Sequence, residues 1–163
     1  MQFKELFAAD KGKWEDPQAL FQHLDKTFHF DLDACAALDQ WRQPSLNGAK
    51  CDEYYTAQDS LTKDWTLNNC AFLWPQPSLR QPVDDARIGE FVRKAWRTAR
   101  LSTPVVCLLP VRVEAAWFAD YCVGADENGV DREIYFLKDR LKYGDGPLMV
   151  VIMRSSVFAE VSA

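Results

Sequence analysis

Hydrophobic residues recur along this chain at helical spacing in two main places. Leu20, Phe21, Leu24 and Phe28 share one helical face, and Asp16-Pro17 is a typical helix start, so we expect a helix over about residues 17–27. A clearer helix is indicated by apolar residues spaced three and four apart, which are Ile88, Phe91, Val92, Ala95, Trp96 and Ala99. Asp84 or Asp85 can cap it, and a shorter helix is expected over residues 115–121.

Other apolar stretches have the pattern of strands. Residues 70–74 and 105–109 are continuous apolar runs, typical of strands buried on both faces of a parallel sheet. In residues 28–37, apolar and polar residues alternate at first, and we expect the strand to end near Asp33. Two further strands are expected at residues 133–137 and 148–154, with turn-forming residues between them at 144–147. Residues 138–143 either continue the strand at 133–137 or form a turn. Residues 38–58 are expected to have little regular structure.

Strands that alternate with helices, followed by two neighbouring strands, predict an α/β protein with a mostly parallel sheet and an antiparallel edge. The length of 163 residues fits a single domain. We expect residues 1–13 to form a polar N-terminal arm and residues 14–163 to form the domain.

Composition and charge narrow the classes of protein. The charged N-terminus is unlike a signal peptide, no apolar run is long enough to span a bilayer, and the five cysteines are widely spaced. We therefore expect a cytoplasmic protein with reduced thiols. With two histidines and no Cys-x-x-Cys, the sequence predicts no metal site, and it lacks phosphate-binding glycine motifs. The net charge of −5 argues mildly against nucleic acid.

Several short segments follow one another in the order of the motifs of a known family. The first is Phe30-Asp31-Leu32-Asp33-Ala34-Cys35-Ala36, similar to that family's first cofactor-binding motif. Further similar segments are residues 14–17, 49–56, 59–61 with Trp65, 91–95, 105–110 with Trp117-Phe118, and 134–143. Together these segments resemble the small phage-type DNA N6-adenine methyltransferases, a Dam-like family, over about residues 14–146.

The resemblance implies a Rossmann-like methyltransferase fold that binds S-adenosylmethionine. It assigns Asp31 or Asp33 to the cofactor's ribose hydroxyls or ammonium group, and Ala34 to close approach of the backbone. It places Asp59 near the cofactor's adenine, where a carboxylate can accept from the exocyclic amine. An ordinary turn or cap residue is the alternative for each acid.

The sequence departs from the family where the target adenine is held. Active members carry Asp or Asn followed by Pro-Pro-Tyr, whose carbonyls accept the amine hydrogens while the ring stacks on the extruded base. Here the positions are Trp74-Pro75-Gln76-Pro77, which offer no side-chain acceptor at the first position and no aromatic ring at the last. A slip of two residues would make Gln76 the acceptor, with Leu79 still unable to stack. An ordinary core Trp followed by a proline-rich loop is the remaining alternative.

Basic residues suggest a contact with DNA phosphates. One face of the second helix carries a basic stripe of Arg93, Lys94, Arg97 and Arg100, and the later strand carries alternating Lys138, Arg140 and Lys142. A solvated helix face is the alternative.

Three functions follow from these observations. The first is a methyltransferase-like protein of phage or prophage type with impaired catalysis, which retains binding of cofactor, DNA or a host or phage protein in a bacterial cytoplasm. The others are an active adenine-N6 enzyme with an unusual acceptor loop, and an acidic interaction or inhibitor protein without enzymatic activity.

Overall fold

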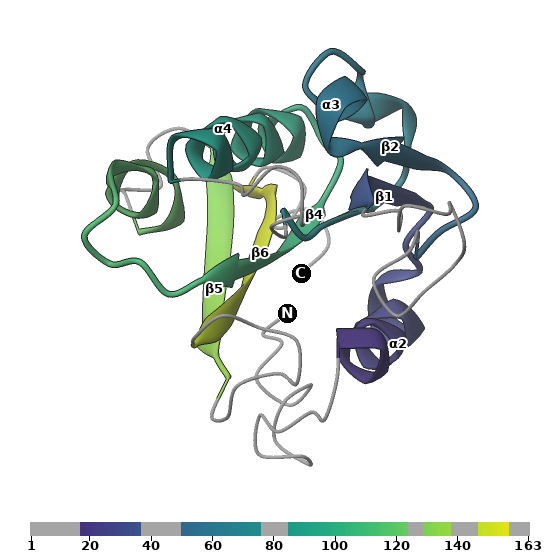
Figure 1. Cartoon of the computed structure of the whole chain (residues 1–163). Coiled ribbons are helices and arrows are strands. Elements are labelled where there is room, and N and C mark those ends of the chain that lie inside the picture. Colours follow the sequence, from purple (N-terminus) through teal and green to yellow (C-terminus); the bar gives the residue numbers. More distant parts are fainter. Residues whose placement is uncertain (1–16, 37–49, 76–84, 124–128, 138–146, 157–163) are drawn as a thin grey trace.

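The computed structural model describes residues 17–36, 50–75, 85–123, 129–137 and 147–156. The described elements form one domain around a six-stranded sheet (Figure 1). In chain order they are α2 (Pro17–Phe28), β1 (Leu32–Ala36), β2 (Tyr54–Thr56), α3 (Ala57–Ser60), the 3₁₀ turn η1 (Trp65–Leu67), β3 (Ala71–Leu73), α4 (Asp85–Arg100), β4 (Val105–Pro110), the π-helical turn η2 (Phe118–Cys122), β5 (Val130–Phe136) and β6 (Leu148–Ser155).

The strand order is β2-β1-β3-β4-β6-β5. β1 pairs in parallel with β2 and β3, and β3 pairs in parallel with β4. β6 runs antiparallel to both β4 and β5. This arrangement confirms the predicted single-domain α/β sheet, mostly parallel with an antiparallel edge.

Both faces of the central strands are buried, which explains why their sequences are continuously apolar. On one face, side chains such as Leu73 and Cys107 pack against Phe91 and Ala95 of α4. On the other face, Phe72 belongs to a cluster that contains Leu20 and Leu24 of α2. The two amphipathic helices therefore cover opposite faces of the sheet (Figure 1).

Most of the predicted elements are confirmed, with shifted boundaries. The expected helix over 17–27 is α2, the long apolar helix is α4, and the runs at 70–74, 105–109 and 148–154 are β3, β4 and β6. The expected helix over 115–121 ends in the π-helical turn η2, and the strand expected over 133–137 begins three residues earlier, at Val130. Residues 138–143 lie outside the described part of the chain.

The predicted strand over 28–37 was placed too early. Phe28 still belongs to α2, and His29 follows with a positive φ of 54°, a conformation that commonly ends helices. The Asp25 carboxylate then accepts a hydrogen bond from the Phe30 amide at 2.8 Å, which directs the chain toward β1. Because β1 begins only at Leu32, Asp33 lies inside the strand rather than at its end.

The expectation of little regular structure over 38–58 is wrong for its last part. Tyr54–Thr56 forms β2, an edge strand parallel to β1, and α3 follows directly. The Asp33 amide donates to the Glu53 carbonyl at 3.0 Å, just before β2. A three-residue strand is too short for an alternating pattern to be visible in the sequence.

Candidate functional site

The order of the strands reverses at β1, which identifies one edge of the sheet as the candidate site. From β1 the chain adds β2 on one side, and then β3 and β4 on the other. Asp33 of β1 lies in register with Phe72 of β3, so the carboxyl ends of the two strands are neighbours. Open parallel sheets bind ligands in the crevice outside the carboxyl ends at such a reversal. The candidate site is therefore the edge formed by the ends of β1, β2 and β3.

Trp74 directly follows β3, and its ring belongs to the core. The side chain is 7% exposed and lies in the apolar cluster on the α2 face, together with Phe72 and Leu20. The Lys50 ammonium lies 6.0 Å from the centroid of the indole ring. Pro75 is also buried, whereas Gln76 and Pro77 lie outside the described residues. An indole has one N–H donor and no acceptor, so Trp74 cannot accept a hydrogen from an amine.

Asp33 joins two segments of the chain beside the candidate site through hydrogen bonds of its carboxylate. Its side chain is buried, with Oδ1 accepting from the Cys35 amide at 3.3 Å and Oδ2 accepting from the Lys50 amide at 2.9 Å. The second bond joins β1 to the segment that leads into β2. Burial raises the pKa of Asp33 to about 6, against the opposing effect of the two amides. Ala34, the next residue, is fully buried within the α4-side core.

The raised pKa of Asp33 predicts that stability falls as the pH rises. The folded protein binds a proton at Asp33 in a range where the unfolded chain has already lost it, so the effect develops between about pH 4 and pH 6. Because a tenfold change in proton affinity corresponds to about 1.4 kcal/mol, the loss should reach about 2–3 kcal/mol. Urea denaturation across this range should show it as the difference between wild type and Asp33→Asn.

The comparison with Asp33→Asn removes the contributions of the other carboxyl groups, which vary with pH in both proteins. Asp120→Asn, at an exposed position in η2, is a matched control and should leave the pH dependence of the wild type in place. A difference between wild type and Asp33→Asn that stays constant from pH 4 to pH 7 would contradict a proton bound at Asp33.

Asp31 lies at the opposite edge of the sheet from the candidate site. It precedes β1, and Oδ1 accepts from the Cys70 amide at 3.0 Å while Oδ2 accepts from the Asn69 amide at 2.9 Å. These bonds join the amino ends of β1 and β3. The structure thus separates Asp31 from the other residues that the sequence assigns to the cofactor, and gives its carboxylate a structural contact.

Asp59 is an exposed carboxylate at the candidate edge. It lies in α3, which directly follows the carboxyl end of β2. Its Oδ2 accepts from the Thr56 hydroxyl at 3.2 Å, and its carbonyl accepts from the Thr62 amide at 3.0 Å. These contacts fix the turn while the side chain stays open to solvent.

Two cations, Arg87 and Lys50, lie at the candidate site although the sequence pattern did not assign them to it. The Arg87 guanidinium donates to the Ala57 carbonyl at 3.0 Å and so ties α3 to the first turn of α4, while Lys50 lies beside Asp33 and Trp74. A cation in the first turn of a helix is unfavourable, because the helix dipole already places positive charge there. The position of Arg87 in the first turn of the expected helix was therefore the one sign in the sequence that this side chain makes a specific contact. Nothing in the sequence pattern distinguishes Lys50 from a surface lysine.

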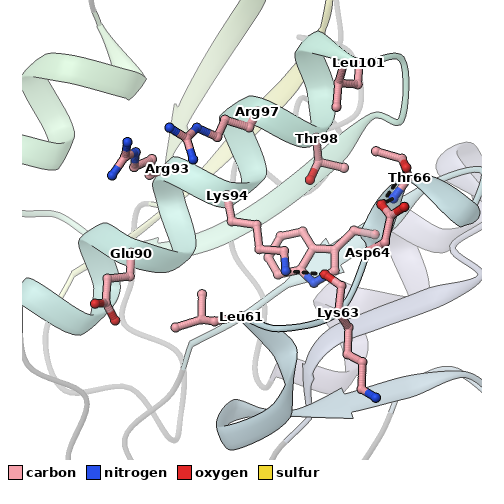
Figure 2. Close-up of a pocket in the computed structure, with 11 residues that line it drawn as sticks. Leu61, Lys63, Asp64, Thr66, Glu90, Arg93, Lys94, Arg97, Thr98 and Leu101 are labelled. Atoms are coloured by element: carbon pink, nitrogen blue, oxygen red, sulfur yellow. Dashed lines mark hydrogen bonds between the residues drawn. The ribbon is translucent and has the colours of Figure 1, made fainter.

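Three basic residues of α4 line a groove, but only two of them are open to solvent. Arg93 and Arg97 are exposed, whereas Lys94 is half-buried and donates to the Ser60 carbonyl at 2.8 Å and to the Lys63 carbonyl (Figure 2). Burial lowers the pKa of Lys94, whose ammonium lies 5.2 Å from the centroid of the Trp65 ring. Lys138 and Arg140 lie outside the described residues.

Neither a metal cluster nor a membrane helix occurs in the described part of the chain. No three His, Cys, Asp or Glu side chains among these residues are grouped as metal ligands would be. None of the described helices is both long and apolar enough to cross a membrane.

Comparison with known proteins identifies a family. A family model described as DNA N-6-adenine-methyltransferase (Dam) matches residues 4–152, which is most of the chain. Neither the comparison with curated proteins nor that with solved structures gives a match. The matched segment contains every described strand except the last residues of β6. The chain therefore belongs to the DNA N-6-adenine-methyltransferase (Dam) family.

Proposed function

We propose that this chain is a Rossmann-like, methyltransferase-type protein that binds S-adenosylmethionine at the carboxyl ends of β1 and β2 and is impaired in adenine methylation. Family membership supports the cofactor, because enzymes of this kind draw their methyl group from S-adenosylmethionine. The reversal of strand order at β1 supports the location. DNA is the proposed macromolecular ligand at this edge.

The described residues fit part of such a cofactor site. Asp59 is exposed at the end of β2 and has the acceptor oxygens that the exocyclic amine of the cofactor's adenine requires. Ala36, the last residue of β1, is small, which allows a ligand to approach the backbone there, whereas Ala34 is buried in the core on the α4 side. Asp33 acts by positioning, because both of its oxygens accept from backbone amides that shape the chain around the site. When bound, the cofactor would supply an electrophilic methyl group on its sulfonium.

Asp31 is not part of this proposal. Its carboxylate accepts from two amides at the amino ends of β1 and β3, on the other side of the sheet. A ligand at the carboxyl ends would have to draw Asp31 away from both bonds. Hydrogen bonds to a charged group contribute about 1.5–3 kcal/mol, so this exchange is unfavourable.

The burial of Trp74 is the observation that carries the proposed impairment. An adenine-N6 enzyme needs an acceptor at this position, since the amine lone pair is delocalised into the ring until carbonyl groups bind its hydrogens. Trp74 supplies no acceptor, and its ring packs in the core on the α2 side of the sheet. The Pro75 carbonyl is the one element of the usual acceptor arrangement that the described residues retain.

Isothermal titration calorimetry with S-adenosylmethionine tests the cofactor part of the proposal. We expect saturable binding by the wild type, and an affinity at least about tenfold lower for Asp59→Ala, which corresponds to about 1.4 kcal/mol for a lost charge-assisted hydrogen bond. Asp120→Ala removes an equally exposed carboxylate from η2 and should bind like the wild type. Absence of binding by the wild type would contradict the proposal and favour a role in protein interaction alone.

A further inference from the structure

The groove beside α4 has a wall that is fixed by buried contacts. It has a volume of about 460 Å³ and lies between the α4 segment from residue 90 onward, with Leu101 just after the helix, and residues 61–66 (Figure 2). Trp65 is 1% exposed, and its indole N–H donates to the Ser60 carbonyl at 3.1 Å. Lys94 donates to the same carbonyl and to that of Lys63. Because these bonds connect the turn to α4, the groove is already formed without a ligand.

Cations outnumber acids in the groove, whose charged lining residues are Lys63, Arg93, Lys94, Arg97, Asp64 and Glu90. The Asp64 carboxylate accepts from the Thr66 amide at 2.9 Å and keeps its charge, while Glu90 pairs with Arg87 at 3.5 Å. In contrast, Lys63, Arg93 and Arg97 have no ion-pair partner among the described residues. The groove is therefore a local cationic surface on a chain with a net charge of −5.

Exposed leucines accompany these cations. Leu101 lines the groove with 68% of its surface exposed, and Leu67, next to the groove residue Thr66, is 80% exposed. Leu61 also lines the groove and is half-buried. In Figure 2, Lys94 lies between the guanidinium groups of Arg93 and Arg97 and the side chain of Lys63, and Leu61 lies to one side of them near Glu90. A ligand that crosses the groove would therefore meet both cations and apolar surface.

The groove extends away from the proposed cofactor edge, and only Leu61, which directly follows α3, and Glu90, which pairs with Arg87, lie near that edge. Thr98 and Leu101 lie at the end of α4 that leads into the amino end of β4, and Thr66 leads into the amino end of β3. The cofactor is proposed to bind at the carboxyl ends of the strands. A ligand in the groove could therefore be held at the same time as a ligand at that edge.

We propose that this groove binds an acidic segment of a partner protein that carries leucine-like side chains between its carboxylates. Complementary charge would come from Lys63, Arg93 and Arg97, and the partner's apolar side chains would cover Leu61, Leu67 and Leu101. This assignment differs from the sequence-based expectation that Arg93, Lys94 and Arg97 contact DNA phosphates, since Lys94 is held by two carbonyl groups of its own chain.

Nucleic acid fits the groove less well than an acidic peptide does. Single strands bind through aromatic side chains on which bases stack, and the aromatic residue of this groove, Trp65, is buried beneath Lys94. Duplex DNA would meet the cations through its phosphates but would leave the exposed leucines without an apolar partner.

Fluorescence anisotropy with a short labelled peptide tests the proposal. The probe carries a central Leu-Leu pair between Glu and Asp residues, and two companion peptides replace either the leucines with Ser or the acids with Gln and Asn. We expect the parent peptide to bind more tightly than both companions. Arg93→Glu and Arg97→Glu should each weaken its binding by about fivefold or more, because a like charge then faces the peptide.

Lys26→Glu is the matched control, since it reverses an exposed charge on α2, on the other face of the sheet, and should leave peptide binding unchanged. Both arginine variants should bind S-adenosylmethionine like the wild type, so failure of this proposal is distinguishable from failure of the proposed function. Absence of peptide binding would overturn the proposal. So would labelled duplex DNA that binds the wild type, loses affinity with Arg93→Glu and is not displaced by the peptide.

Discussion

Transfer of a radiolabelled methyl group from S-adenosylmethionine to the adenines of mixed-sequence duplex DNA is expected to be at least about a thousandfold slower with this protein than with a family member that carries Asn-Pro-Pro-Tyr. Loss of one preorganised acceptor typically lowers a rate by about 10²- to 10³-fold. Loss of the stacking ring removes about 1–3 kcal/mol per base in addition. Trp74 and Pro77 represent both losses in one segment.

The same assay separates impaired catalysis from an unusual but working acceptor. Under the alternative alignment Gln76 accepts from the amine, so wild type would form N6-methyladenine readily and Gln76→Ala would abolish it. The matched control is Asn69→Ala, an exposed amide at the amino end of β3, far from the acceptor position. Robust methylation by the wild type would therefore contradict the proposed impairment.

Periodicity predicted the sheet and its two large helices because their burial leaves a strong pattern. α4 presents apolar residues every three or four positions to one face of the sheet, and β4 and β6 are buried on both faces. Such segments are defined by many apolar residues that agree with one another. Their type and order could thus be predicted from sequence, while their ends depended on local contacts such as the Asp25 carboxylate bond to the Phe30 amide.

The candidate site was only partly predictable because its contacts join residues that are distant in sequence. Asp31 and Asp33 are two positions apart and similar in type, yet one bonds to amides of residues 69–70 and the other to the amide of residue 50. The pattern around each acid is the same in the sequence. The pairing of β1 with β3 on one side and β2 on the other is what separates their roles.

The basic face of α4 illustrates the same limit. Arg93, Lys94 and Arg97 are equivalent in a helical pattern, and the sequence treats them as one stripe. The turn at residues 61–66 packs against one side of the helix, where Lys94 donates hydrogen bonds to the carbonyls of Ser60 and Lys63. Arg93 and Arg97 therefore remain available to a ligand. Charge counted along the sequence therefore overstates the number of free cations.

Replacement of Trp74 by Ala should destabilise the domain by about 3–5 kcal/mol, the usual loss when a large buried aromatic side chain is truncated. Trp74 is 7% exposed and packs with Phe72 of β3 and with the residues of α2, so the cavity would lie between the sheet and that helix. Urea denaturation would measure the change in the free energy of unfolding. Trp74→Phe, which retains an aromatic ring, should lose less than half as much.

Trp96→Ala is the matched control, because this indole is only half-buried on α4 and stacks beside the Arg100 guanidinium. Its truncation should cost about 1 kcal/mol, which is typical of partly exposed positions. A loss below about 1 kcal/mol for Trp74→Ala would contradict a core role and would favour a ring that faces the ligand cleft. A large loss would mean that Asn cannot be reintroduced at position 74 without weakening the core, so simple repair of the acceptor motif should fail to restore methylation.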